Sequence, residues 1–81
     1  MNIERVLVTG GLGFIGGAFI RYLLSNQPTL EITNIDSLTY AANDEHRRFF
    51  QRFSNYREFN SSIENSEVML NVLSLAKPDV I

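Results

Sequence analysis

The sequence predicts an α/β fold in which a parallel β-sheet alternates with helices, and two observations lead to that prediction. Short runs of β-branched and apolar residues alternate with segments of helical periodicity, an order typical of parallel sheets with right-handed crossovers. All 5 glycines lie within residues 10–17, which follow the first predicted strand and lead into the first predicted helix. A chain of 81 residues has room for at most one small domain, of about three and a half βα units here.

Composition excludes several classes of protein. A hydrophobic content of 44% with a net charge of −2 argues against disorder and against a strongly basic nucleic-acid binder. The chain has no cysteine, which excludes a disulfide scaffold and a cysteine nucleophile, and its single histidine, His46, excludes a multi-histidine metal site. The sequence has neither a signal peptide nor the apolar run of about 20 residues that a membrane span needs, so we expect a cytoplasmic protein without membrane contact.

Three strands are predicted at residues 5–9, 31–36 and 56–60. Residues 5–9 are a β-branched apolar run bounded by glycine, which is typical of a buried strand. In residues 31–36, Ile32 and Ile35 are the expected apolar anchors. Residues 79–81 look like the start of a fourth strand, on the other side of the first.

The first helix is predicted over residues 14–25 and ends before Pro28, because proline cannot continue a helical hydrogen-bond ladder. Arg21 is expected on the face that points away from the core. The predicted apolar face consists of Phe14, Ile15, Ala18, Phe19, Tyr22 and Leu23.

Two more helices are predicted, over residues 44–53 and 61–76, and Pro78 stops the second. Ser61 with Glu64 fits a capping box, although Asn65 or Ser66 fits a cap equally well. The expected apolar side of the last helix is made of Val68, Leu70, Val72, Leu73 and Leu75.

The glycines form a pattern that is typical of dinucleotide binding when it follows a strand and opens a helix. Gly10, Gly13 and Gly16 fit GxxGxxG, while Gly11, Gly13 and Gly16 fit GxGxxG. One glycine makes the tight turn, one lets the backbone approach a pyrophosphate, and one lets helix and strand pack closely. The start of the helix then offers N–H groups and a partial positive charge to phosphates.

Asp36 follows Gly16 at the spacing of about 20 residues where an acid is expected to bind the hydroxyls of the adenosine ribose. No arginine or lysine follows Asp36 before Arg47, so the pattern favours NAD over NADP. The alternative is an ordinary glycine turn with a solvent-facing aspartate.

At this level of detail the chain resembles a known family. Residues 8–16 look like the extended short-chain dehydrogenase/reductase family of nucleotide-sugar enzymes, which implies a Rossmann-type fold. Residues 35–43 are similar to a segment of the dTDP-glucose 4,6-dehydratases, from which Ser37 and Ala42 depart. The resemblance implies a nucleotide-sugar substrate and a homodimer at full length.

The resemblance also implies a set of NAD contacts. Phe14 and Ile15 would lie at the pyrophosphate turn, together with the glycines. Asp36, Ser37, Leu38 and Thr39 would surround the adenosine ribose. Ser62 and Ile63 stand where the family usually has Asp-Ile at the adenine edge, so the usual aspartate is missing.

The catalytic Tyr-x-x-x-Lys pair of the family is absent. The only lysine is Lys77, and Leu73 stands four residues before it. We therefore expect no catalytic residue in this chain, which reads as the N-terminal part, residues 1–81, of a NAD-binding domain in a longer protein. The resemblance implies that the longer protein is a NAD-dependent lyase that transfers hydride at sugar C4 and removes water across C5 and C6.

Three alternatives remain open. The chain fits another nucleotide-sugar enzyme of the same family, such as an epimerase or a decarboxylase, and it fits a nucleotide-binding module without catalysis. Residues 46–53 interleave arginine with phenylalanine, a pattern that single-stranded nucleic-acid binders use, or that an amphipathic helix produces with its phenylalanines packed on a sheet. His46 itself is expected at the surface.

Overall fold

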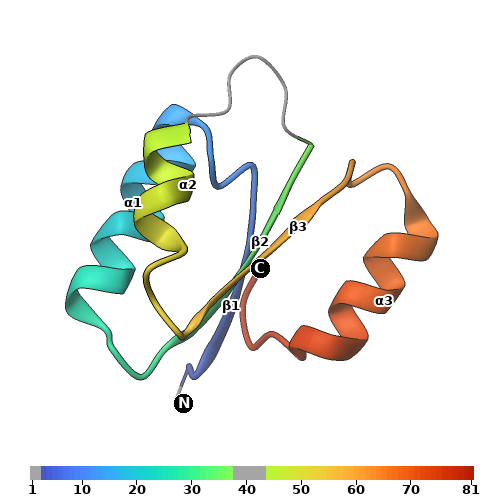
Figure 1. Ribbon diagram of the computed structural model, residues 1–81. Helices are drawn as coiled ribbons and strands as arrows, with labels where there is room; N and C mark the ends of the chain where they lie inside the picture. The colour runs from blue at the N-terminus through green and yellow to red at the C-terminus, as the bar shows by residue number, and fades with distance from the viewer. Residues whose placement is uncertain (1–2, 38–43) are drawn as a thin grey trace.

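The computed structural model describes residues 3–37 and 44–81 of the chain. Within them, strands and helices alternate as the sequence predicts (Figure 1). The strands are β1 (Arg5–Thr9), β2 (Glu31–Asp36) and β3 (Tyr56–Asn60), and the helices are α1 (Phe14–Asn26), α2 (Asp44–Phe50) and α3 (Ser66–Ala76). The predicted α/β class and the bounds of all three strands are confirmed.

The strands form one parallel sheet in the order β1-β2-β3. Val6 pairs with Ile32 in β2, and Ile32 pairs with Tyr56 in β3. On the other edge of β1, Val80 makes a parallel bridge with Val6, and its carbonyl accepts a hydrogen bond of 2.9 Å from the N–H of Leu7. The end of the chain therefore extends the sheet on the side of β1 that the sequence predicts.

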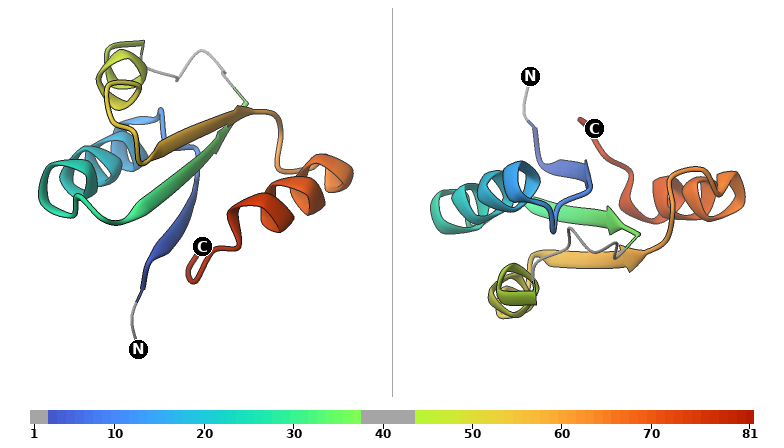
Figure 2. Two further views of the ribbon diagram at one scale, coloured as in Figure 1. Left: turned by 60° about the horizontal axis from the view of Figure 1, so that its bottom comes forward. Right: turned by 90° about the horizontal axis from the view of Figure 1, so that it is seen from above.

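The sheet has helices on both faces. Helices α1 and α2 cover one face and α3 covers the other (Figures 1 and 2). Because strand side chains alternate, Val6 belongs to the core under α1 and α2, whereas Leu7 belongs to the core under α3. The fully buried Ile20 and Phe50 belong to the first core.

The predicted apolar face of α1 is wrong except at Leu23, which is half-buried and packs against the first core. The structure buries Gly17, Ile20 and Leu24, whereas Phe14 is 91% exposed and Ile15 is 82% exposed. The helix is apolar on most of its circumference, so periodicity alone left more than one stripe available. Gly17 decides between them, because a side chain at this position would collide with His46 of α2.

The same close approach corrects the expectation that His46 lies at the surface. The residue is half-buried, and its ring stacks on Phe50 with the ring centroids 5.6 Å apart. The helix that carries it is shorter than predicted. It ends at Phe50, because the N–H groups after Gln51 bond three residues back, from Arg52 to Phe49 and from Phe53 to Phe50.

Helix α3 begins at Ser66 rather than residue 61. The side chain of Asn65 caps it by accepting a hydrogen bond of 3.1 Å from the N–H of Val68, so the capping box at Ser61 does not form. Val72 and Ala76 are buried, whereas Leu70 and Leu75, which the sequence places on the apolar side, are exposed.

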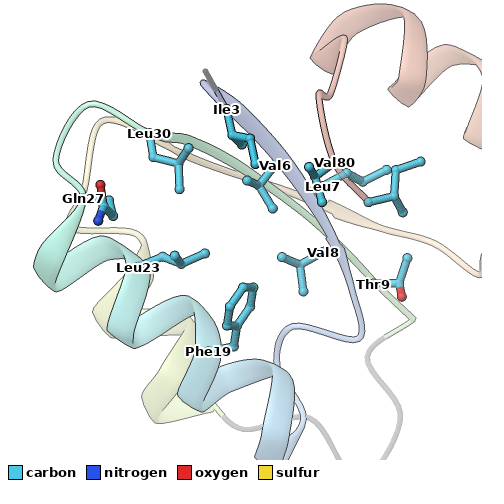
Figure 3. Close-up of a pocket in the computed structure, with 11 residues that line it drawn as sticks. Ile3, Val6, Leu7, Val8, Thr9, Phe19, Leu23, Gln27, Leu30 and Val80 are labelled. Atoms are coloured by element: carbon cyan, nitrogen blue, oxygen red, sulfur yellow. The ribbon is translucent and has the colours of Figure 1, made fainter. Parts of the chain in front are cut away.

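An apolar groove of about 530 Å³ lies beside β1, on the side away from β2. Figure 3 shows Phe19 and Leu23 of α1 facing Val6 and Val8 of β1 across it. Leu30 and the C-terminal residues Val80 and Ile81 also contribute to its lining. The part of the chain that the structure describes thus leaves apolar surface uncovered at this edge.

Candidate functional site

The glycine turn follows β1 and leads into α1. Gly10 has φ of +67°, in the left-handed region that glycine adopts without strain. Its N–H donates to the carbonyl of Ile35 at 2.8 Å, and its own carbonyl accepts from the N–H of Gly13 at 3.0 Å. These two bonds fold the chain back between the end of β1 and the start of α1, which makes Gly10 the tight-turn residue.

Two other glycines let the turn pack against its surroundings. A Cβ at Gly16 would lie 2.6 Å from the carbonyl oxygen of Gly10, which is a backbone atom and has no room to move. A Cβ at Gly11 would collide with the side chains of Ile20 and Asn34. The turn therefore needs glycine at both positions, as a close strand–helix junction requires.

The start of α1 is suited to an anion. Its N-cap is Gly13, which has no side chain to bond the first N–H groups, and its first turn contains no acidic residue. The N–H groups of a first turn have no partner within the helix, and the helix dipole favours negative charge there. Phe14 and Ile15 stand exposed beside this turn. The arrangement has the form of a phosphate-binding helix start.

Asp36 lies beside the turn, at the end of β2. It is only 6% exposed, and its Oδ2 accepts a hydrogen bond of 2.9 Å from the N–H of Leu12. The structure thus brings together the glycine turn and the acid that the sequence picks out separately. A carboxylate has acceptor sites for about four hydrogen bonds, so this contact is compatible with binding a ribose hydroxyl as well.

The remaining predicted contacts that the structure describes lie along the same edge of the sheet. Ser37 is exposed directly after β2, and the predicted contacts Leu38 and Thr39 lie outside the described residues. The N–H of Ser61 donates to the carbonyl of Asp36 at 3.0 Å, which joins the ends of β2 and β3. Ser62 and Ile63 follow immediately and are exposed. All the described candidates therefore follow the carboxyl ends of the three strands, where ligands bind in open α/β sheets.

Comparison with known proteins shows which family the chain belongs to. The family model described as the NAD dependent epimerase/dehydratase family matches residues 6–81. The chain belongs to this family. The turn, the helix start and the acid at the end of β2 thus occur in a family whose description names NAD.

Several curated proteins that are similar to this chain are dehydratases. The dTDP-glucose 4,6-dehydratase of Escherichia coli is 35% identical over 77 residues, which are 95% of this chain and 21% of that protein. The enzyme of the same name from Haemophilus influenzae is 40% identical over 77 residues, or 22% of its length. The chain therefore spans about a fifth of the curated relatives that it matches.

Solved structures give the same result. The dTDP-glucose 4,6-dehydratase of Bacillus anthracis in complex with NAD superposes with a TM-score of 0.89 at 35% identity, over 95% of this chain and 25% of that one. The UDP-glucose 4-epimerase of Thermotoga maritima, solved with UDP-glucose, gives a TM-score of 0.75 at 33% identity over 93% of this chain and 22% of that one. The Rossmann-type fold that the resemblance implies is confirmed.

The sequence analysis did not identify Asn34 of β2 as a residue that holds the glycine turn. Its side chain is 0% exposed, and its Oδ1 accepts a hydrogen bond of 2.8 Å from the N–H of Gly11. The signal was available, because a buried polar side chain inside a strand needs a partner. Asn34 sits two residues before Asp36, so both side chains point to the same face of the sheet, toward the turn.

Other chemistry is limited in the described part of the chain. Lys77 lies at the C-cap of α3, at the opposite end of the sheet from the glycine turn (Figure 1). Residues 3–37 and 44–81 contain no cluster of three or more histidine, aspartate or glutamate side chains that could hold a metal ion. In the same residues, no helix has the length and apolar character needed to cross a membrane.

Proposed function

We propose that residues 1–81 are the N-terminal, NAD-binding part of a nucleotide-sugar dehydratase of the dTDP-glucose 4,6-dehydratase type. The observation that carries the proposal is the hydrogen bond between Asp36 and Leu12, which fixes the predicted ribose acceptor against the phosphate-binding turn. The matches to dehydratases from several organisms support the reaction class.

Each group of site residues has a role in this proposal. Gly10, Gly13 and Gly16 shape the turn, and the backbone around Phe14 and Ile15 faces the pyrophosphate. Asp36 accepts from the adenosine ribose, next to Ser37, Leu38 and Thr39. Ser62 and Ile63 border the adenine, with a serine hydroxyl where the family usually has a carboxylate. In the proposed reaction, NAD supplies reversible acceptance of a hydride from sugar C4, while water leaves across C5 and C6.

The preference for NAD over NADP rests on charge. A 2′-phosphate would meet the carboxylate of Asp36 at the end of β2. The first arginine after it, Arg47, is committed elsewhere, since its Nε lies 2.9 Å from a carboxylate oxygen of Glu58. A phosphate at this position would therefore meet repulsion without a cationic partner.

The reaction itself needs residues that this chain does not contain, so we assign the catalysis to a longer protein and expect no activity from the chain alone. Two observations support this assignment. The chain spans about a fifth of its curated relatives, and the apolar groove beside β1 is of the kind that further strands and helices cover in a complete sheet. We extend the proposal to a homodimer, as the resemblance implies, and to a cytoplasmic location, as expected from the sequence; light scattering of the natural-length protein tests the assembly.

A second candidate is a nucleotide-sugar epimerase of the same family. The match to the UDP-glucose 4-epimerase of Thermotoga maritima favours it, because the described residues superpose on that chain as well. The family model names both activities. A decarboxylase or a non-catalytic NAD-binding module would use the same turn.

Binding of nucleic acid through residues 46–53 is disfavoured, because the aromatic rings there are already in use. Phe50 is fully buried, and Phe49 packs under the guanidinium of Arg21, which lies 4.0 Å from the ring centroid. Bases would find few free ring faces on this segment.

The test is an assay of the natural-length protein with NAD and two substrates, in which products are separated by liquid chromatography, because epimers have the same mass, and are then identified by mass spectrometry. We expect dTDP-glucose to lose one water. Conversion of UDP-glucose to a sugar of unchanged mass would instead identify an epimerase. Turnover of neither substrate with NAD bound would leave a nucleotide-binding module, and absence of NAD binding would refute the assignment.

A further inference from the structure

A buried relay of hydrogen bonds runs from Gly11 of the glycine turn across the sheet to Glu58, which forms an ion pair with Arg47 of α2. The N–H of Gly11 donates to Oδ1 of Asn34 at 2.8 Å, and Nδ2 of Asn34 donates to the Tyr56 hydroxyl at 3.1 Å. That hydroxyl donates to Oε1 of Glu58 at 2.8 Å. The other carboxylate oxygen of Glu58 lies 2.9 Å from Nε of Arg47. The relay and this ion pair thus link the turn after β1 to a helix that begins more than thirty residues later.

The relay is buried, so water does not replace a hydrogen-bond partner that is lost from it. Asn34 is 0% exposed, Tyr56 is 8% exposed, and the Glu58 side chain is 7% exposed. A buried donor or acceptor without a partner is costly, so each group in the relay has a strong preference for one orientation.

The carboxylate of Glu58, at one end of the relay, determines which group donates in each hydrogen bond. An ionised carboxylate only accepts hydrogen bonds, so the single proton of the Tyr56 hydroxyl is directed to Glu58. The hydroxyl oxygen is then left as an acceptor for Asn34, which must turn its NH₂ toward Tyr56. The carbonyl oxygen of Asn34 consequently faces the N–H of Gly11.

The state of the tyrosine fits this direction. Burial raises the pKa of Tyr56 well above its ordinary value, and the charge of Glu58 raises it further, against an opposing effect of Asn34. The hydroxyl therefore keeps its proton at physiological pH. Arg47 neutralises the outer side of Glu58, and Nδ2 of Asn60 also donates to Oε2 of Glu58 at 2.8 Å.

We propose that Glu58 and Tyr56 are positioning residues for the cofactor site, which act by fixing the side-chain amide of Asn34 so that it holds the glycine turn in its binding shape. The proposal rests on the proposed NAD-binding function. In this proposal both residues act through Asn34 and not by contact with the cofactor. If the amide of Asn34 turned over, its NH₂ would face the N–H of Gly11, and two donors in contact would push the turn away from β2, the strand that carries Asn34.

The experiment uses the natural-length protein and the variant Tyr56→Phe, which keeps the ring that packs on Phe50 but removes the hydroxyl. Hydrogen exchange of the peptide that contains Gly11 is followed by mass spectrometry, and NAD affinity by calorimetry. We expect faster exchange at Gly11 and a dissociation constant for NAD raised about fivefold, the equivalent of one net hydrogen bond. The matched control is Tyr22→Phe, which removes the same atom from a side chain that is 63% exposed, and it should leave both readouts unchanged.

A second variant tests the direction of hydrogen-bond donation along the relay. Glu58→Gln keeps the shape but adds a donor, so it no longer forces the tyrosine proton outward. We expect it to speed exchange at Gly11 on its own and to add nothing in the Tyr56→Phe background, since coupled residues are non-additive. Additive effects of the two changes would overturn the relay, and so would unchanged exchange at Gly11 in both single variants.

The two readouts separate this proposal from the proposed function. If the natural protein does not bind NAD, the proposed function fails, and exchange at Gly11 still decides whether the relay exists. If NAD affinity falls in Tyr56→Phe without any change at Gly11, the relay is wrong while the cofactor assignment stands. Should Tyr56→Phe fail to fold, Glu58→Gln alone supplies the exchange measurement.

Discussion

The carboxylate of Asp36 accepts a hydrogen bond from the backbone N–H of Leu12 at a distance of 2.9 Å. This bond joins the end of β2 to the glycine turn that follows β1. It explains how two features separated in sequence form one site, because the acid that is expected at a ribose also holds the turn expected at a pyrophosphate. The following predictions test the packing and charges around this junction.

Substitutions at Gly16 and Gly13 should separate stability from binding. In Gly16→Ala the new methyl group meets the carbonyl oxygen of Gly10, and we expect the free energy of unfolding to fall by about 1–3 kcal/mol. In Gly13→Ala the nearest atom is 3.3 Å away, so the loss should stay below about 1 kcal/mol, the size of an N-cap effect. Gly13→Ala should instead weaken NAD binding, because the proposed function places this residue at the pyrophosphate. Urea unfolding and NAD titration measure the two effects, and equal destabilisation by both changes would contradict the packing.

The buried stripe of α1 predicts unequal effects along the helix. Ile20→Ala should lower the free energy of unfolding by about 2–5 kcal/mol, since Ile20 is fully buried under the turn. Tyr22→Ala, on the exposed side, should change it by less than about 0.5 kcal/mol. Urea unfolding of the natural-length protein compares them, and the reverse order would restore the helix face that the sequence predicts.

We expect the burial of Tyr56 to make the protein lose stability in alkali. Its pKa is raised above the ordinary value of 10.0, chiefly by burial, so the folded protein holds the proton more tightly than the unfolded chain does. The resulting stabilisation is complete below pH 10.0 and is lost as the pH rises above it. Urea midpoints should fall less steeply above that pH in Tyr56→Phe than in the wild type or in Tyr22→Phe. Identical slopes in all three proteins would show that Tyr56 is not buried as described.

We expect the contribution of Asp79 to stability to be lost in acid. The backbone N–H groups of Glu4 and Arg5 donate to its Oδ2 and lower its pKa below the ordinary value of 3.8. Its contribution to stability is therefore present above pH 3.8 and is lost as the pH falls through the lowered pKa. The stability difference between the wild type and Asp79→Ala should accordingly be seen at neutral pH and vanish in acid. A difference that persists at the lowest pH would mean that the carboxylate does not hold the start of β1.

The strands and the turn were predictable because their signals are local. Residues 5–9 and 31–36 are short β-branched runs bounded by turn residues, and Asp36 follows from its spacing to Gly16. The packing face of α1 was not, because that helix is apolar nearly all round and its orientation depends on where Gly17 admits α2. The relay from Asn34 to Glu58 was also out of reach, since it depends on the register that pairs these two residues across the sheet.

The most direct test of the cofactor site is a calorimetric titration of NAD into the natural-length protein, its Asp36→Asn and Asp36→Ala variants, and the control Glu67→Gln on α3. Because a hydrogen bond to a charged group is lost, we expect Asp36→Ala to weaken binding by about tenfold to hundredfold. Asp36→Asn still has an acceptor for Leu12 and should lose less, Glu67→Gln should bind as the wild type does, and NADP should bind the wild type more weakly than NAD. Unchanged NAD affinity in Asp36→Ala would contradict the assignment of this junction as the cofactor site.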